Sequence, residues 1–197
     1  MPQRPELILA STSRYRRELL ERLRLPFSIR APEVDESVRP GESPAAVASR
    51  LALAKARAIA ETQPGAVVIG SDQVADLDGR AIGKPRSHDR AREQLRAMSG
   101  RTLVFQTAVA VVCIERGYEA RASVPVTVRV RTLSDAEIEH YLRTETPYDC
   151  AGSAKVETLG IALLESVASD DPTALVGLPL IRTCEMLRAV GIDPLAP

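Results

Sequence analysis

The chain has 197 residues, 45% of them hydrophobic, which is enough to bury a sizeable core and is typical of one domain. Basic and acidic side chains number 26 each, so the zero net charge provides no global field for binding nucleic acid. Aromatic residues make up only 3%, which argues against a surface for stacking bases. Any anion must therefore be bound by a local cluster of residues.

Cysteine and histidine are sparse. Cys113, Cys150 and Cys184 have no CxxC spacing and cannot all pair, which favours reduced thiols in a cytoplasmic protein. His88 and His140 lie far apart in polar sequence, so a His/Cys metal site is not expected. A required metal would be Mg²⁺ or Mn²⁺ on carboxylates and phosphate. No stretch reaches about 18 apolar residues and no signal peptide is apparent, so we expect no contact with a membrane.

The chain opens with a predicted strand, Glu6–Ala10, and a predicted helix, Arg14–Arg24. Between them, Ser11 and Ser13 offer hydroxyl groups that suit a helix N-cap. Three arginines crowd the first turn, where the helix dipole disfavours cations: Arg14, Arg16 and Arg17. An anion held by hydroxyl, backbone N–H and guanidinium groups would explain this arrangement, and a solvated basic face is the alternative.

An acidic loop follows a short predicted strand at Phe27–Arg30. It carries Glu33, Asp35 and Glu36, which could be solvated or could reach a metal ion. Ser43 and Pro44 have the chemistry of an N-cap and a first helical residue, so a helix is predicted from there to about Glu61. Lys55 lies near the buried side of that helix, where it could either face a phosphate or extend its head to water.

The central segment, residues 66–85, has the pattern of a buried strand and a hairpin. Ala66–Ile69 is a short apolar run that predicts an interior strand. Asp78-Gly79 is a strong signal for a two-residue hairpin turn, with Arg80–Ile82 as the returning strand. We therefore expect the chain after the hairpin to return beside the end of the first strand.

This hairpin would bring Asp72, Gln73 and Lys84 into one cleft. The alternative is that these polar side chains merely face water. A carboxylate directly after an apolar strand would be costly if it were buried without a partner, which favours a functional role for Asp72.

The remaining elements are predicted from apolar periodicity and capping residues. They are a helix at Asp89–Met98, strands at Leu103–Ile114 and Val124–Thr132, a helix from Ser134 to about Arg143, a strand at Ile161–Leu164 and a terminal helix from Pro179. A polar loop, Tyr148–Ser153, precedes Lys155 and Glu157. Because hairpins and helical crossovers coexist, one α/β domain with a mixed sheet is predicted.

Taken in order, the Ser/Arg-rich helix start, the acidic loop, GSDQV, GKP and YDCAGS resemble the Maf family of nucleotide pyrophosphatases. The resemblance runs from LILASTS to VGLPLI. More narrowly, SDQV, YDCAGS and DPTALVGLPLI are similar to the branch that hydrolyses 7-methyl-GTP, whereas the dTTP/UTP branch would show a DTV-type sequence. One departure is Arg14, where the family often has proline.

The resemblance implies an α/β fold, with residues 1–197 forming a single elongated, two-lobed domain of Maf/ITPase-like type. A central mixed twisted sheet would carry a nucleotide cleft between the lobes. The implied reaction converts 7-methyl-GTP to 7-methyl-GMP and diphosphate as housekeeping removal of a modified nucleotide. The implied partner is this small-molecule nucleotide, with no nucleic acid and no membrane, and a homodimer is left open.

Residue by residue, the resemblance makes Asp72 the proton acceptor. Tyr15, Gln73 and Glu157 match the positions that separate substrate specificities; a cationic methylguanine would suit a π-face from Tyr15 and a negative group from Glu157. The expected phosphate-binding residues are Ser11, Ser13, Arg16, Lys55 and Lys84. The divalent cation, Mg²⁺ or Mn²⁺, is expected on Glu36 and Asp72.

Two alternatives stay open at this point. One is pyrophosphatase activity on dTTP, UTP or another modified nucleotide. The other is a non-catalytic nucleotide-binding regulator of cell division. Intact Asp72 and Lys84 favour the enzyme.

Overall fold

The computed structural model describes residues 5–196. Within them, a seven-stranded mixed sheet has the order β2-β1-β3-β5-β6-β7, with β4 paired to β3. The strands are β1 (Leu7–Ala10), β2 (Ser28–Arg30), β3 (Val67–Leu77), β4 (Arg80–Ile82), β5 (Thr102–Cys113), β6 (Tyr118–Val130) and β7 (Leu164–Ala168). The α-helices are α1 (Arg14–Glu21), α2 (Pro44–Ala60), α3 (His88–Met98), α4 (Asp135–Glu145) and α5 (Leu180–Ala189). The predicted α/β class and mixed sheet are confirmed.

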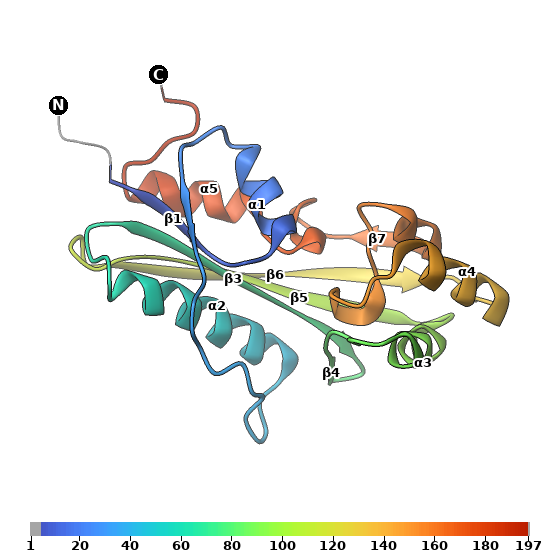
Figure 1. Ribbon diagram of the computed structural model, residues 1–197. Helices are drawn as coiled ribbons and strands as arrows, with labels where there is room; N and C mark the ends of the chain where they lie inside the picture. The colour runs from blue at the N-terminus through green and yellow to red at the C-terminus, as the bar shows by residue number, and fades with distance from the viewer. Residues whose placement is uncertain (1–4, 197) are drawn as a thin grey trace.

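Helix α2 covers one face of the sheet, and α1 and α5 cover the other (Figure 1). The apolar run of β1 alternates between these layers, with Ile8 packed under α2 and Leu9 under α1 and α5. At Gly70, a Cβ atom would lie 2.2 Å from the Ala52 carbonyl oxygen, so only glycine lets α2 approach β3 this closely. This contact places Lys55 beside β3.

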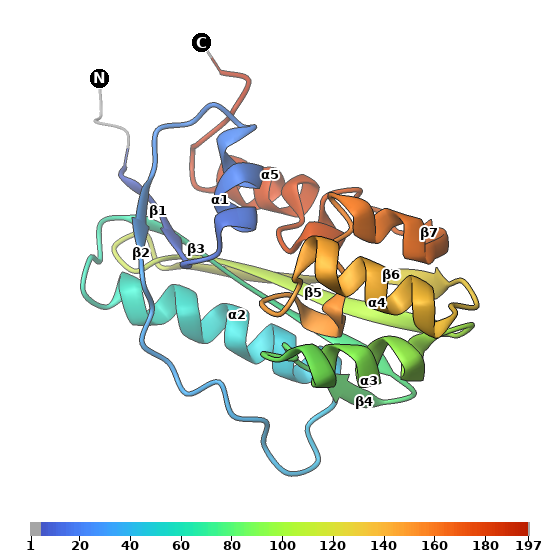
Figure 2. The ribbon, with the colours of Figure 1, turned by 45° about the vertical axis from the view of Figure 1, so that its right-hand side comes forward.

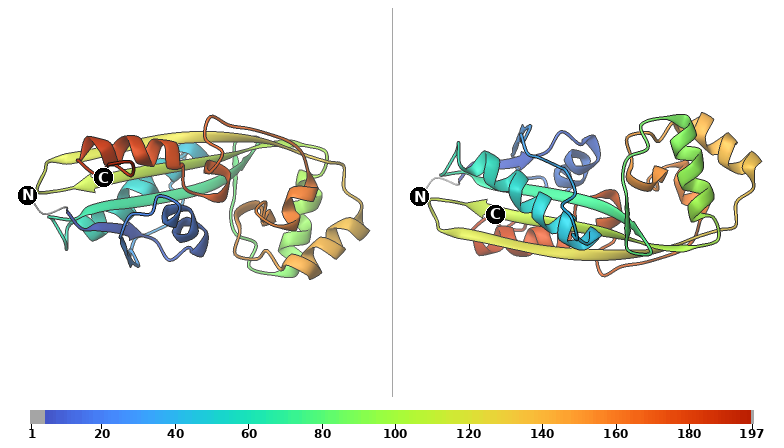
Figure 3. Two further views of the ribbon diagram at one scale, coloured as in Figure 1. Left: turned by 90° about the horizontal axis from the view of Figure 1, so that it is seen from above. Right: turned by 90° about the horizontal axis from the view of Figure 1, so that it is seen from below.

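A second lobe is formed by α3, α4 and the distal parts of β3, β5 and β6, which share a separate hydrophobic core. Figure 2 shows α3 and α4 side by side, and Figure 3 shows them at one end of an elongated molecule with α1, α2 and α5 at the other. The long strands β5 and β6 run through both lobes. The predicted two-lobed shape is therefore confirmed.

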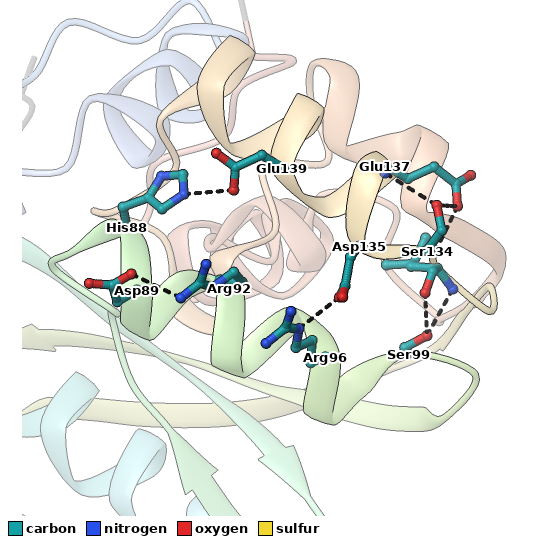
Figure 4. A network of polar contacts seen from close by, with 10 residues as sticks. His88, Asp89, Arg92, Arg96, Ser99, Ser134, Asp135, Glu137 and Glu139 are labelled. Atoms are coloured by element: carbon teal, nitrogen blue, oxygen red, sulfur yellow. Dashed lines mark hydrogen bonds and ion pairs between the residues drawn. The ribbon is translucent and has the colours of Figure 1, made fainter.

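Polar side-chain contacts join α3 to α4 on the surface of the second lobe (Figure 4). Arg96 Nε lies 2.7 Å from Asp135 Oδ1, and His88 Nε2 lies 2.9 Å from Glu139 Oε2. His88 Nδ1 also contacts the Tyr148 hydroxyl group at 3.0 Å. His88 is thus partly buried in a network of side chains that joins the two helices.

Most predicted elements are confirmed, but several boundaries differ. Helix α1 ends at Glu21 and not at Arg24. Strand β3 does not end at Ile69, because its pairing with β5 continues to Asp76. Strand β6 begins at Tyr118, ahead of the apolar alternation that defined its predicted start. The predicted strand at Ile161–Leu164 is wrong: residues 159–163 form a 3₁₀ turn, stabilised by a bond from Gly160 N–H to the Lys155 carbonyl group at 3.0 Å.

The local sequence signals are confirmed. Asp78 and Gly79 have φ angles of 52° and 79° at the β3–β4 turn. Ser134 and Glu137 form the predicted capping box of α4. The three cysteines are free thiols. Among residues 5–196, no helix has both the length and the apolar character needed to cross a bilayer.

Candidate active site

A cleft of about 420 Å³ opens between the lobes. Its walls come from the start of α1, the acidic loop, α2, β3, the segment after β4, and the loops around Cys150 and Gly177. The predicted site residues that line it are Ser11, Ser13, Tyr15, Arg16, Glu36, Lys55, Gln73, Lys84 and Glu157. Asp72 lies directly beneath them, in contact with Lys55 and only 8% exposed. The fold thus brings every predicted site residue together.

The floor of the cleft is a cluster of one ammonium and two carboxylate groups. Lys55 Nζ lies 2.7 Å from Asp72 Oδ1 and 2.7 Å from Glu36 Oε1. The ion pair with Lys55 offsets the free-energy cost of burying the Asp72 carboxylate. Asp72 lies within β3, whereas the sequence suggested a position after the strand. The pKa of Glu36 is lowered, first by the hydrogen bond from Lys55, with Lys84 and Arg16 also contributing.

Two carboxylates are a suitable but incomplete set of ligands for a hard divalent cation. Among the described residues, no group of three or more His, Cys, Asp or Glu side chains could hold a metal ion. Mg²⁺ is commonly bound by one or two carboxylates together with substrate phosphates and water. Glu36 and Asp72, which both contact Lys55 Nζ, could supply the protein ligands of such a shared site.

The start of α1 has the form of an anion site. Ser13 Oγ caps the helix by accepting from the Arg16 N–H, and Ser11 Oγ accepts from the Ser13 N–H at 3.1 Å. Each hydroxyl group can still donate its own hydrogen to a ligand. Together with the positive end of the helix dipole, these groups suit a phosphate.

Arg16 is held by a loop that the sequence analysis did not assign to the site. Its Nε donates to the Gly177 carbonyl oxygen at 2.9 Å, and the buried Ser71 hydroxyl donates to the same oxygen at 2.8 Å. Burial lowers the pKa of Arg16, and Asp72 and Glu36 oppose that effect. Gly177 has a φ of 114°, which favours glycine, and its VGLP sequence was the available signal.

The side-chain amide of Gln73 is held in one orientation by hydrogen bonds to other groups of the protein. Its Nε2 donates to Thr107 Oγ1 at 2.9 Å and to the carbonyl oxygens of Ala174 and Leu175 at 3.0 and 2.9 Å. Three protein acceptors thus use the two amide hydrogens, so Oε1 is the group that Gln73 can offer to a ligand. Thr107 is fully buried and was not predicted as part of the site.

Tyr15 and Glu157 come from opposite lobes. The Arg14 guanidinium carbon lies 4.6 Å from the centre of the Tyr15 ring, so a cation already covers one face of that ring. The Tyr15 hydroxyl oxygen lies 3.7 Å from Cys150 Sγ, and burial raises the Tyr15 pKa to about 12. The pKa of Glu157 is raised, first by partial burial in the cleft wall.

The fold and cleft are those of an α/β protein that handles a small anionic ligand. The chain matches the family model of Maf-like proteins over residues 6–190, and it belongs to that family. It is 63% identical over 194 residues to the 7-methyl-GTP pyrophosphatase of Albidiferax ferrireducens, covering 98% of each chain.

Two further relatives carry the same name. The protein from a Polaromonas species is 64% identical over 191 residues, which are 97% of this chain and 87% of the relative. The protein from Bordetella pertussis is 59% identical over 191 residues, which are 97% of this chain and 95% of the relative. The resemblance noted in the sequence is thereby confirmed.

Proposed function

We propose that this chain is a nucleoside triphosphate pyrophosphatase that hydrolyses 7-methyl-GTP to 7-methyl-GMP and diphosphate, with residues 1–197 as one domain. The observation that carries the proposal is the cleft itself, where a buried carboxylate, Asp72, lies among the cations Arg16, Lys55 and Lys84. The names of relatives that are 59–64% identical support the choice of substrate.

The α1 side of the cleft is assigned to the triphosphate. Ser11, Ser13 and the first-turn N–H groups would bind phosphate oxygens, and Arg16 would add a guanidinium group already oriented by Gly177. Lys84 approaches from the segment after β4. Cleavage of a phosphoanhydride depends chiefly on such positioning and charge neutralisation.

Asp72 is assigned as the general base. Lys55 Nζ donates a hydrogen bond to one of its oxygens in the ligand-free protein, and the carboxylate can accept a proton from a water molecule that attacks the α-phosphorus. The bond between the α-phosphorus and the bridging oxygen breaks, and diphosphate leaves. A divalent cation held by Glu36 and Asp72 would supply further neutralisation of phosphate charge.

The base would lie against Tyr15, Gln73 and Glu157. Guanine presents N–H donors on its Watson–Crick edge, and these match the free Oε1 of Gln73 and the Glu157 carboxylate. Methylation at N7 makes the base cationic, so Glu157 would also offset its charge. This combination favours 7-methylguanine over uracil or thymine.

Replacing Glu157 with glutamine should lower kcat/KM for 7-methyl-GTP much more than for GTP, because only the methylated base carries a charge to be offset. The two nucleotides would be compared under steady-state conditions. Because the Glu157 pKa is raised, the wild-type preference should also decline as the pH falls through that raised pKa, at a higher pH than for an ordinary glutamate. Equal losses of kcat/KM on both nucleotides would show that Glu157 does not recognise the methylated base.

Replacing Lys84 with alanine should weaken the handling of every nucleoside triphosphate, whatever its base. Loss of a charge-assisted phosphate contact costs about 1.5–3 kcal/mol, which would appear as similar reductions of kcat/KM across substrates. Arg80→Ala, at an exposed position on β4, is the matched control and should change little. A loss confined to one base would contradict the phosphate assignment.

The proposal is tested by steady-state assay of the purified protein on 7-methyl-GTP, GTP, dTTP and UTP with Mg²⁺ or Mn²⁺. We expect the highest kcat/KM for 7-methyl-GTP. Higher kcat/KM values for dTTP or UTP would show that the preferred substrate is a pyrimidine nucleotide. Tight nucleotide binding without diphosphate release would instead favour a non-catalytic regulator.

A further inference from the structure

The most tightly organised feature of the cleft is the position of Lys55. Its side chain is 8% exposed and its ammonium group lies between Asp72, whose side chain is 12% exposed, and Glu36, whose side chain is 63% exposed. The helix that carries Lys55 is fixed on β3 by the close contact at Gly70. Both carboxylates therefore already have a cationic partner.

These carboxylates are also the groups that we assign to the divalent cation. A dication at the same point would meet an ammonium group at short range, and like charges repel most strongly where water is excluded. Lys55 cannot simply be left without a partner, because a buried ammonium group is costly unless it is paired. It therefore needs another anion before it can leave the carboxylates.

The triphosphate is the anion that the cleft can offer. Arg16 and Lys84 line the same cleft, and both act on Glu36 through their charge. A phosphate bound between the α1 start and these residues would lie within the same cluster as Lys55. Nucleotide binding would then give the ammonium group a new partner, and the ammonium group would release the two carboxylates.

We propose that Lys55 is an internal counter-ion that blocks the metal position until a nucleotide binds. In the ligand-free protein it neutralises Glu36 and Asp72; in the complex it pairs with the triphosphate and leaves the carboxylates to the metal. This inference rests on the proposed function, because it takes the metal ligands and the triphosphate site from it. Its consequence is that binding of metal and of nucleotide are coupled, each raising the affinity for the other.

The direct test is to measure, by electron paramagnetic resonance, the affinity of the whole protein for Mn²⁺ without nucleotide. Lys55→Met removes the charge and keeps much of the apolar stem, so we expect it to bind Mn²⁺ about 10-fold or more tighter than wild type. Lys155→Met is the matched control. Lys155 Nζ lies 2.8 Å from Glu145 Oε2, and this ion pair is not part of the cleft floor. The control variant should leave Mn²⁺ affinity unchanged.

Adding Glu36→Gln to Lys55→Met should abolish the gain, which ties it to this carboxylate pair. Mn²⁺ should also raise the melting temperature of Lys55→Met more than that of wild type, so a variant that is weakly folded in EDTA still gives a result. Equal or weaker Mn²⁺ affinity in the folded Lys55→Met protein would overturn the proposal.

A wild-type measurement is independent of any variant. The ¹⁵N resonance of the Lys55 ammonium group should not change with Mg²⁺ alone and should shift when Mg²⁺ and an α,β-methylene analogue of 7-methyl-GTP are added together. A shift with Mg²⁺ alone would overturn the counter-ion role. Diphosphate release by wild type is measured separately, so failure of this inference is distinguished from failure of the proposed function.

Discussion

Replacing Asp72 with asparagine is expected to lower kcat by about 10²–10⁴-fold, the usual loss when a general base is removed. The change is nearly isosteric, and the β3–β5 pairing of Asp72 with Ala108 involves only the backbone. Lys55 keeps Glu36 as a partner, so the fold should survive. The measurement is diphosphate release under saturating substrate, with thermal melting as the check on folding.

The matched control is Asp76→Asn on the same strand. Asp76 Oδ1 accepts from the Gly79 N–H at 2.8 Å, a bond that an asparagine oxygen can also make, so activity should be retained. A kcat near the wild-type value for Asp72→Asn would show that Asp72 is not the base. An unfolded Asp72→Asn protein would show that its pair with Lys55 chiefly anchors α2 to β3.

Removing divalent metal should lower activity by about 10³-fold, because the metal's contribution to charge neutralisation is worth several kcal/mol. Two carboxylates plus phosphate oxygens are the ligands that Mg²⁺ or Mn²⁺ prefers, so either ion should restore the rate. The measurement is diphosphate release by protein treated with EDTA and then supplied with each ion.

EDTA already saturated with Mg²⁺ is the control for this experiment and should leave the rate unchanged. Full activity on protein and substrate freed of metal would show that Arg16, Lys55 and Lys84 neutralise the phosphates unaided. It would also remove the metal role assigned to Glu36.

Features encoded by neighbouring residues were predictable. The cap of α1 at Ser13, the turn at Asp78-Gly79 and the capping box at Ser134 each depend on a few consecutive side chains, and all are present. The apolar runs of β1 and β5 likewise indicated strands. Local chemistry thus accounts for most elements of the fold.

Features that depend on distant contacts were not predictable. The pairing of Lys55 with Glu36 and Asp72 requires α2 to lie against β3, and no local pattern sets that distance. The strand continues through Asp72 because β5 pairs with it, which an apolar run that stops at Ile69 conceals.

The contacts that orient Gln73 and Arg16 were not predictable either. Gln73 was recognised as a specificity residue through the family resemblance, but its fixed orientation comes from Thr107 and from two carbonyl groups about a hundred positions later in the chain. Arg16 and Ser71 both donate to the Gly177 carbonyl oxygen, which also lies far from them in the chain. Such contacts between distant segments are set by the fold, not by local sequence.

Cleavage of the bond between the α-phosphorus and the oxygen that bridges it to the β-phosphate of 7-methyl-GTP is the step that we propose for this cleft. Its most direct test is product analysis after the purified protein has acted on 7-methyl-GTP in ¹⁸O-labelled water. We expect 7-methyl-GMP that carries the label, together with unlabelled diphosphate. Formation of 7-methyl-GDP and labelled orthophosphate would contradict it.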